Sequence, residues 1–321
     1  MSRTNQILAG LFVAQLILAA FTWSGTSYEK EESAGSESLL TFSMDEITGF
    51  TVNAKATEAG KPDREIDVKR SGVDWVVPSA DGYPADKKKI EEVLSKLVES
   101  KIKDPIATKK TNHNALNVGD TVYTKKVTVR AGDKTAELIV GSAKGSSMHI
   151  RRKGENNVYL ARGISAWKVG DRVESYVDSN YIKFDDPTEV RVVNAFGSLD
   201  LVKKPDGAWI VNQLPTGTAV DDSRVRSFVS AARNIRLSKP VGKTLKPEYG
   251  LSPESVRANV VLKRGDDIVK YSVGAFDGDE VYVKDEGNDF IVKVRKYAVD
   301  SLIGQTPDKF IKESTSAQPG Q

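Results

Sequence analysis

The sequence contains no cysteine and only two histidines in 321 residues. Without thiols, the chain has no disulfide framework, no thiolate metal site and no lipoprotein anchor of the kind that requires a cysteine. Neither sign of charge is in large excess, because 47 basic and 44 acidic residues leave a net charge of +3. This balance does not predict the basic stripe that binds nucleic acid, and no nucleic-acid partner is expected.

Motifs of common enzymes are absent as well. Residues 140–145 lack the spacing and strand-to-helix setting of a phosphate-binding loop, and no Gly-x-Ser-x-Gly nucleophile elbow occurs. His113 is expected in a solvent-exposed polar loop. His149 aligns with Tyr282 of a repeated strand, which favours a plain strand side chain over a metal ligand. No catalytic, cofactor-binding or metal-binding residues are therefore assigned, and no cofactor is expected.

Two acidic hairpin segments, residues 277–280 and 285–289, are rich in oxygen ligands that calcium accepts. Their spacing is not that of an EF-hand, and Asp, Asn and Gly are the usual residues of turns. The matching turns earlier in the chain, residues 144–145 and 151–154, are basic. The opposite charges indicate either two faces for different partners or ordinary surface divergence, and calcium binding by the acidic pair stays open.

One long apolar run stands near the start of the chain. Residues 6–23 carry no charge and approach the roughly 20 residues that cross a bilayer as a helix. Arg3 precedes the run and acidic residues follow it, which places Met1 in the cytoplasm. We predict that residues 1–23 form a cytoplasmic start and an uncleaved signal anchor, the alternative being a cleaved signal peptide. Polar residues 24–41 are expected to be a flexible tether, and residues 314–321 a disordered tail.

The rest of the sequence repeats itself. Asp86 and Asp221 lie 135 positions apart, and each precedes an apolar stripe of helical spacing, as in Ile90 and Leu94 of the first copy. Asp before such a stripe is a typical N-cap. The sequence therefore predicts two units of similar build, residues 42–186 and 187–313.

Strand patterns surround each predicted helix. A hairpin containing Trp75 or Trp209 precedes it, and four alternating segments follow, which predicts an antiparallel meander. Each tryptophan is expected to pack under its own helix. Pro105 and Pro240 are expected to stop the helices, and the units to end on aromatic residues, Phe184 and Phe310. The predicted fold class is α+β: a tandem repeat of strand-rich units, each with a β-hairpin region, one capped helix and a meander, after a single transmembrane helix.

These motifs resemble a known family. The segments Trp75-Val-Val-Pro, Tyr83-Pro-Ala-Asp86 and Tyr249-Gly-Leu-Ser-Pro253 are similar to the bacterial domain of unknown function 4340, over nearly all of the chain after Phe42. In the first unit, residues 114–118 stand at the position of the segment 249–253, and their sequence no longer matches its motif. The resemblance implies a membrane-anchored protein that is often encoded beside gliding-motility-type ABC transporter subunits. It implies no catalytic residues.

The expected function is thus that of a non-catalytic accessory or scaffold subunit of an ABC-type transport complex. It would act by protein–protein interaction outside the cytoplasm, on the bacterial inner membrane, as a single-pass protein held through residues 6–23. Its expected partners are other envelope or inner-membrane proteins, among them an ABC-2-type permease and auxiliary subunits. Two alternatives stay open: a glycan- or lipid-binding module with a groove between the repeats, and a hydrolase whose acid pair is assembled in space.

Overall fold

The computed structural model describes residues 36–56, 60–164 and 168–313. The predicted anchor, most of the predicted tether and the predicted tail lie outside these residues. Within the described ranges, no helix is both long enough and apolar enough to cross a membrane.

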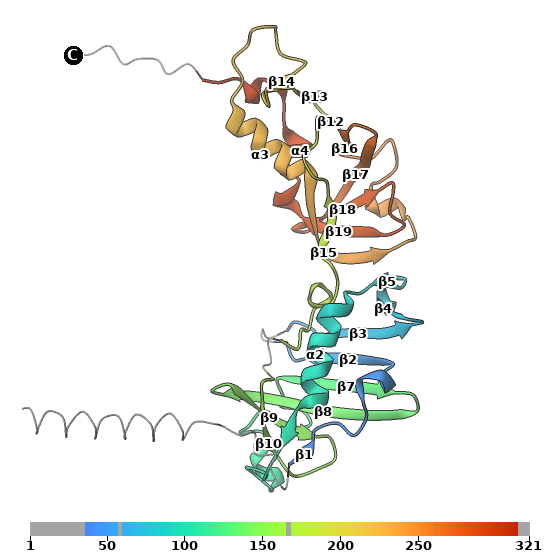
Figure 1. The fold of residues 1–321 in the computed structure, drawn as a ribbon, viewed down its shortest axis with the longest axis vertical. Coiled ribbons are helices and arrows are strands. Elements are labelled where there is room, and N and C mark those ends of the chain that lie inside the picture. The colour runs from blue at the N-terminus through green and yellow to red at the C-terminus, as the bar shows by residue number, and fades with distance from the viewer. Residues whose placement is uncertain (1–35, 57–59, 165–167, 314–321) are drawn as a thin grey trace, which may run out of the picture.

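Two large antiparallel sheets make up the molecule (Figure 1). The first has eight strands in the order β10-β9-β8-β7-β2-β3-β4-β5, and the second has nine in the order β11-β15-β19-β18-β17-β16-β12-β13-β14. The fold is therefore a strand-rich α+β arrangement. The central order is the same in both sheets. In the first, the meander β7–β10 lies beside β2, which continues into the hairpin β3–β4. In the second, the meander β16–β19 lies beside β12, which continues into the hairpin β13–β14.

The strands of the first half, including the small sheet of β1 and β6, are β1 Glu37–Ser38, β2 Gly49–Ala54, β3 Arg64–Ser71, β4 Asp74–Val77, β5 Tyr83–Pro84, β6 Lys101–Ile102, β7 Lys125–Ala131, β8 Lys134–Lys144, β9 Ser147–Arg152 and β10 Tyr159–Arg162. Those of the second sheet are β11 Asn180–Lys183, β12 Glu189–Asn194, β13 Gly197–Lys203, β14 Trp209–Val211, β15 Asn234–Gly242, β16 Ala258–Arg264, β17 Asp267–Asp277, β18 Glu280–Asp285 and β19 Ile291–Arg295.

Helix α2 (Lys87–Glu99) follows the first hairpin and helix α3 (Asp222–Arg233) follows the second. The predicted caps are confirmed. Asp86 Oδ1 accepts from the backbone N–H groups of Lys88 and Lys89 at 3.0 and 3.3 Å. Asp221 Oδ1 makes the equivalent pair of bonds at 2.9 and 3.1 Å. A carboxylate at this position satisfies otherwise free N–H groups and lies at the positive end of the helix dipole.

The other helical segments are short. They are α4 Asp300–Gly304 and the 3₁₀ turns η1 Met44–Glu46, η2 Pro78–Ala80, η3 Lys110–Asn112, η4 Val173–Ser175, η5 Pro247–Tyr249, η6 Lys296–Ala298 and η7 Pro307–Phe310.

The apolar stripe of each long helix packs on one face of its sheet. Ile90, Leu94 and Leu97 of α2 are fully buried in the core. A smaller apolar cluster lies at the other side of each sheet, where a loop crosses the strands. Gly141 makes this possible in the first sheet, because a Cβ there would collide with the carbonyl oxygen of Leu116. Gly274 has the same close approach to the carbonyl oxygen of Tyr249.

Several boundaries differ from the sequence prediction. Strand β1 pairs with β6, and Leu39 and Leu40 are buried, so the part of the predicted tether from residue 37 onward belongs to the fold. Strand β11 falls inside the predicted first unit, 42–186, yet it is the edge strand of the second sheet. Both segments are short apolar stretches without helical periodicity, and only the sheet that each one meets determines its place.

The prolines do not stop the helices. Helix α2 ends at Glu99 and helix α3 at Arg233, several residues before Pro105 and Pro240. Pro240 lies inside strand β15, at a register shift in its pairing with β19. Strand β11 pairs only with residues 234–236 of β15, so Pro240 has β19 as its single neighbouring strand, and the bulge there tolerates a residue without an N–H group.

The aromatic residue that closes the first unit is also not the predicted one. Asp221 N donates to the carbonyl of Phe310 at 2.8 Å, and Asp86 N donates to the carbonyl of Tyr176 at 2.7 Å. Tyr176, not Phe184, is therefore the structural counterpart of Phe310. It is fully buried, and its hydroxyl donates to the carbonyl of Gly170 at 2.8 Å.

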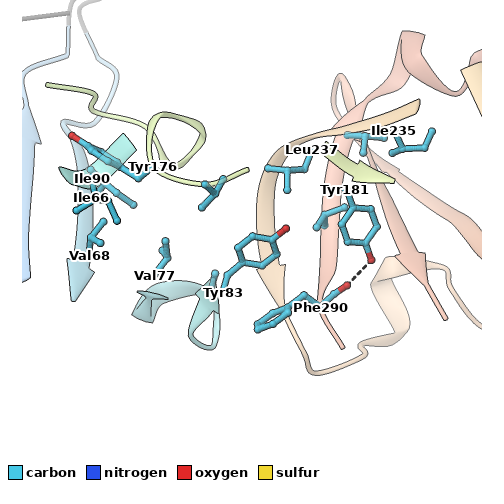
Figure 2. Packing of buried hydrophobic residues seen from close by; sticks show 14 of the residues in the cluster. Ile66, Val68, Val77, Tyr83, Ile90, Tyr176, Tyr181, Ile235, Leu237 and Phe290 are labelled. Atoms are coloured by element: carbon cyan, nitrogen blue, oxygen red, sulfur yellow. Dashed lines mark hydrogen bonds between the residues drawn. The ribbon is translucent and has the colours of Figure 1, made fainter. Parts of the chain in front are cut away.

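The two sheets meet at one end of each, where β5 approaches β15 (Figure 1). Tyr83 packs edge-on against Phe290 with ring centroids 4.9 Å apart. Tyr181 donates its hydroxyl to the Phe290 carbonyl at 2.6 Å, as Figure 2 shows. Asp81 accepts from the backbone N–H of Lys243 at 2.8 Å. Side chains therefore fill the junction between the sheets, and burial raises the pKa of the Tyr83 hydroxyl to about 12.

Candidate functional site

The two histidines lie in the first unit and have structural roles. His113 is buried, with Nε2 2.9 Å from the carbonyl oxygen of Asn156, so the prediction of a solvent-exposed His113 is wrong. A hydrogen bond to a residue distant in sequence makes this polar side chain acceptable in the interior. His149 is a strand side chain of β9, as predicted from Tyr282.

His149 also has a potential chemical partner. Its Nδ1 lies 2.9 Å from Ser142 Oγ, and burial lowers the pKa of the imidazole, so the neutral ring is favoured. A nucleophilic serine needs a base that a third group orients. Among the described residues no carboxylate bonds to His149, and the Ser142 hydroxyl is also within 3.3 Å of the Leu116 carbonyl. The pair therefore ties a loop to the sheet and lacks the third member of a triad.

The acidic hairpins of the second sheet are largely neutralised by neighbouring side chains. Lys293 is buried and pairs with Asp277, whose pKa is lowered by that hydrogen bond. Glu280 accepts from Ser238 Oγ at 2.5 Å and lies 3.6 Å from Lys239 Nζ. In the described parts of the chain, no group of three or more Asp, Glu, His or Cys residues is placed to hold a metal ion.

A candidate site lies instead beside helix α3. An open cavity of about 810 Å³ is bordered by the helix, by the turn of the β13–β14 hairpin and by residues 186–187, which lead into β12. We call it the α3 groove. Its apolar part consists of Pro187, Trp209 and Val229. A half-buried indole beside a helix supplies a large apolar surface, which is typical of binding sites.

Charged groups surround this apolar surface. Lys203 pairs with Asp186 at 2.6 Å, and this hydrogen bond lowers the pKa of the Asp186 carboxyl. Asp186 is thus ionised near neutral pH and is not a proton donor of the kind a hydrolase requires. Arg226 and Arg233 also line the groove, as do Asp206 and Asp222. Neither arginine forms an ion pair with a described carboxylate, although the charge of Arg233 helps to lower the pKa of Asp186. The positions 135 residues earlier hold Glu91 and Val98, so these two cations are particular to the second unit.

In the first unit, the chain itself covers the surface between the helix and the hairpin. Leu39 N donates to the Ser100 carbonyl beside the end of α2, and Thr48 N donates to the Arg130 carbonyl beside β7. The eight residues between them, 40–47, form a segment that we call the arm. Turn η1 of the arm contacts α2.

The second unit fixes the same two ends with a shorter connection. Phe184 N donates to the Arg233 carbonyl at the end of α3, and Thr188 N donates to the Lys263 carbonyl of β16. Only residues 185–187 lie between, three instead of eight, and we call them the link. The five missing residues account for the space beside α3.

The two tryptophans also differ in burial between the units. Trp75 is 1 % exposed and lies against Phe50, whereas Trp209 is only partly buried and borders the groove. Sequence reasoning treated both as core residues and therefore missed the groove. The signal was present in the spacing: β1 and β11 end 145 positions apart (38 and 183), but β2 and β12 begin only 140 apart (49 and 189), a difference of five.

The comparisons with known proteins find a match to one family model. Residues 75–214 match the family model of a domain of unknown function, DUF4340. No curated protein and no solved structure matches the chain. The matched segment is shorter than the sequence motifs suggested, and it runs from β4 of the first sheet to just beyond β14, so it includes both tryptophans. Over that segment, the chain is similar to the DUF4340 family.

Proposed function

We propose that the protein is an extracytoplasmic accessory or scaffold subunit of a membrane transport complex and acts by binding other proteins. One observation carries this proposal: the surface beside α3 is open in the second unit and covered by the chain's own arm in the first. A surface of this kind, with a partly exposed tryptophan and unpaired arginines, favours a partner over a solvent-facing role.

Two parts of the proposal rest on the sequence. Residues 6–23 would anchor the chain in the inner membrane, with the described residues outside the cytoplasm. The proposed association with an ABC-2-type permease and its auxiliary subunits rests on the resemblance to the DUF4340 family. No observation favours the glycan, lipid or hydrolase alternatives, since side chains fill the junction of the units and the Asp186 carboxyl in the groove has a lowered pKa.

Affinity purification from detergent-solubilised membranes tests the function. We expect the tagged full-length chain, at its native level, to recover an ABC-type permease or its ATPase, identified by mass spectrometry. A chain recovered alone in several mild detergents would count against the proposal. The mature N-terminus tests the anchor separately, because a start near Thr26 would indicate a cleaved signal peptide.

A further inference from the structure

We propose that the α3 groove binds a short segment of a partner protein, in which an aromatic and an aliphatic side chain are followed by carboxylates. The inference rests on the proposed function and specifies the chemistry of the partner. Its basis is that the first unit displays, in its own arm, the segment that covers the equivalent surface.

The arm and the link are comparable because their ends are fixed by the same bonds. In both units a backbone N–H reaches a carbonyl at the end of the long helix, and a threonine N–H reaches the carbonyl of the strand beside β2 or β12. The arm must therefore run over the surface that the shorter link leaves open. Its occupancy of that surface serves as a template for the ligand.

The arm covers this surface with apolar side chains. Phe42 is 5 % exposed, and Met44 packs against the core as part of η1. The link has a counterpart for Ile47, since Pro187 is buried at the same distance before the strand, but none for Leu40, Phe42 or Met44. The groove thus lacks the aromatic and aliphatic groups that the arm supplies in the first unit.

Charge specifies the next two positions of the partner segment. Asp45 and Glu46 come directly after Met44 in the arm, where both are exposed and Glu46 accepts from the backbone N–H of Ser43. In the groove, Arg226 and Arg233 lie on one face of α3, seven residues apart, and form no ion pair among the described residues. Asp206 and Asp222 also line the groove, and the charge of Arg233 acts on the Asp186 carboxyl. Carboxylates in the partner segment would provide charge-assisted hydrogen bonds that two guanidinium groups otherwise lack.

A partner protein is the occupant we assign. The chain's own last residues, 314–321, contain neither an aromatic nor an acidic side chain, so they do not match the template. A second copy could offer its arm only by giving up the core contacts of Leu40 and Phe42. Displacing two buried apolar side chains costs several kcal/mol, on the order of 2–5 for each.

A direct test uses a fluorescent peptide with the arm's own sequence, residues 40–47, and the full-length chain in detergent. We expect saturable binding by fluorescence anisotropy. The double substitution Arg226→Glu with Arg233→Glu should weaken it roughly tenfold or more, as expected for the loss of two partly exposed ion pairs. A peptide with Lys in place of Asp45 and Glu46 should lose affinity to a similar degree, and this result does not depend on how the variant protein folds.

The matched control reverses two exposed charges on the other helix, Lys87→Glu with Lys88→Glu, and should bind the peptide as the unmodified chain does. Equal binding of the charge-reversed peptide, or no saturable binding at all, would overturn the inference. A dimer of the chain in sedimentation that is lost in the arginine double variant would also overturn it, in favour of a second copy.

The outcomes separate this inference from the proposed function. If the arginine double variant still recovers the permease or ATPase and the peptide does not bind, the groove assignment is wrong and the scaffold function stands. If the peptide binds as expected and the chain recovers no membrane partner, the groove is a peptide site and the transport role is wrong.

Discussion

Helices α2 and α3 begin at equivalent caps, yet the surface between helix and hairpin is covered by the arm beside α2 and open beside α3. Each starts at a capping aspartate whose own N–H is held by the carbonyl of a buried aromatic residue, Tyr176 or Phe310. They differ in the segment that covers them: eight residues in the first unit and three in the second. The comparison teaches that the length of one connection decides whether the surface beside a helix is open or covered, while the cap of the helix stays the same.

The largest expected effect separates the two tryptophans. Trp75→Ala should lower the free energy of unfolding by about 3–5 kcal/mol, because it leaves a cavity in a closely packed core. Trp209→Ala should cost less than about half of that, since the indole is partly exposed. Denaturant titration followed by far-ultraviolet circular dichroism measures both. Equal losses would mean that the two sites are equally packed.

The glycines at the crossing loops come next. Gly274→Ala places a methyl group against the Tyr249 carbonyl, and Gly141→Ala does the same at Leu116. Each should cost about 1–3 kcal/mol, the range for overpacking. Gly304→Ala is the control, because a Cβ there has open space around it, and a change within about 0.5 kcal/mol is expected. A neutral Gly274→Ala would contradict the close approach.

The helix caps should give similar effects in both units. Asp86→Ala and Asp221→Ala each remove a side-chain acceptor from the first turn and should cost about 1 kcal/mol. Asparagine at either position retains an acceptor oxygen and should restore most of the loss. Thermal and denaturant unfolding of the paired variants measure this. A large loss at only one cap would show that the two helices are not equivalent in stability.

The smallest effect concerns pH and exists only in the first unit. Burial lowers the pKa of His149, so the unfolded chain binds a proton more readily than the folded one. Stability should therefore fall as the pH decreases through the unfolded-state value of about 6.5. His149→Gln should reduce this slope between about pH 7 and pH 5.5. An unchanged slope, measured by denaturant titration at each pH, would exclude the contribution.

Local rules explain which features could be predicted from the sequence. An aspartate before a helical stripe and alternating segments with glycine turns are encoded within a few residues, so the caps and the meanders could be predicted. The arm could not, because Leu40 and Phe42 come after a polar stretch and show no periodicity. Their burial depends on a surface formed by residues far along the chain.

The same reason explains the errors at single residues. His113 is polar and lies in a loop, which predicts exposure, but its hydrogen-bond partner is Asn156, distant in sequence. Pro240 ends a helix in most patterns, whereas a register shift accommodates it in β15. The groove itself required a comparison of spacing between repeats, not of residue types.

The contact between the two units has a consequence for assembly. It joins unlike faces of similar bodies, the β5 side of one and the Phe290 side of the other, and such a head-to-tail contact could in principle continue into an open filament. The positions that correspond to Tyr83 and Phe290 in the other units hold Thr218 and Asn157. The aromatic pair therefore occurs once among the described residues, at the contact between the two units.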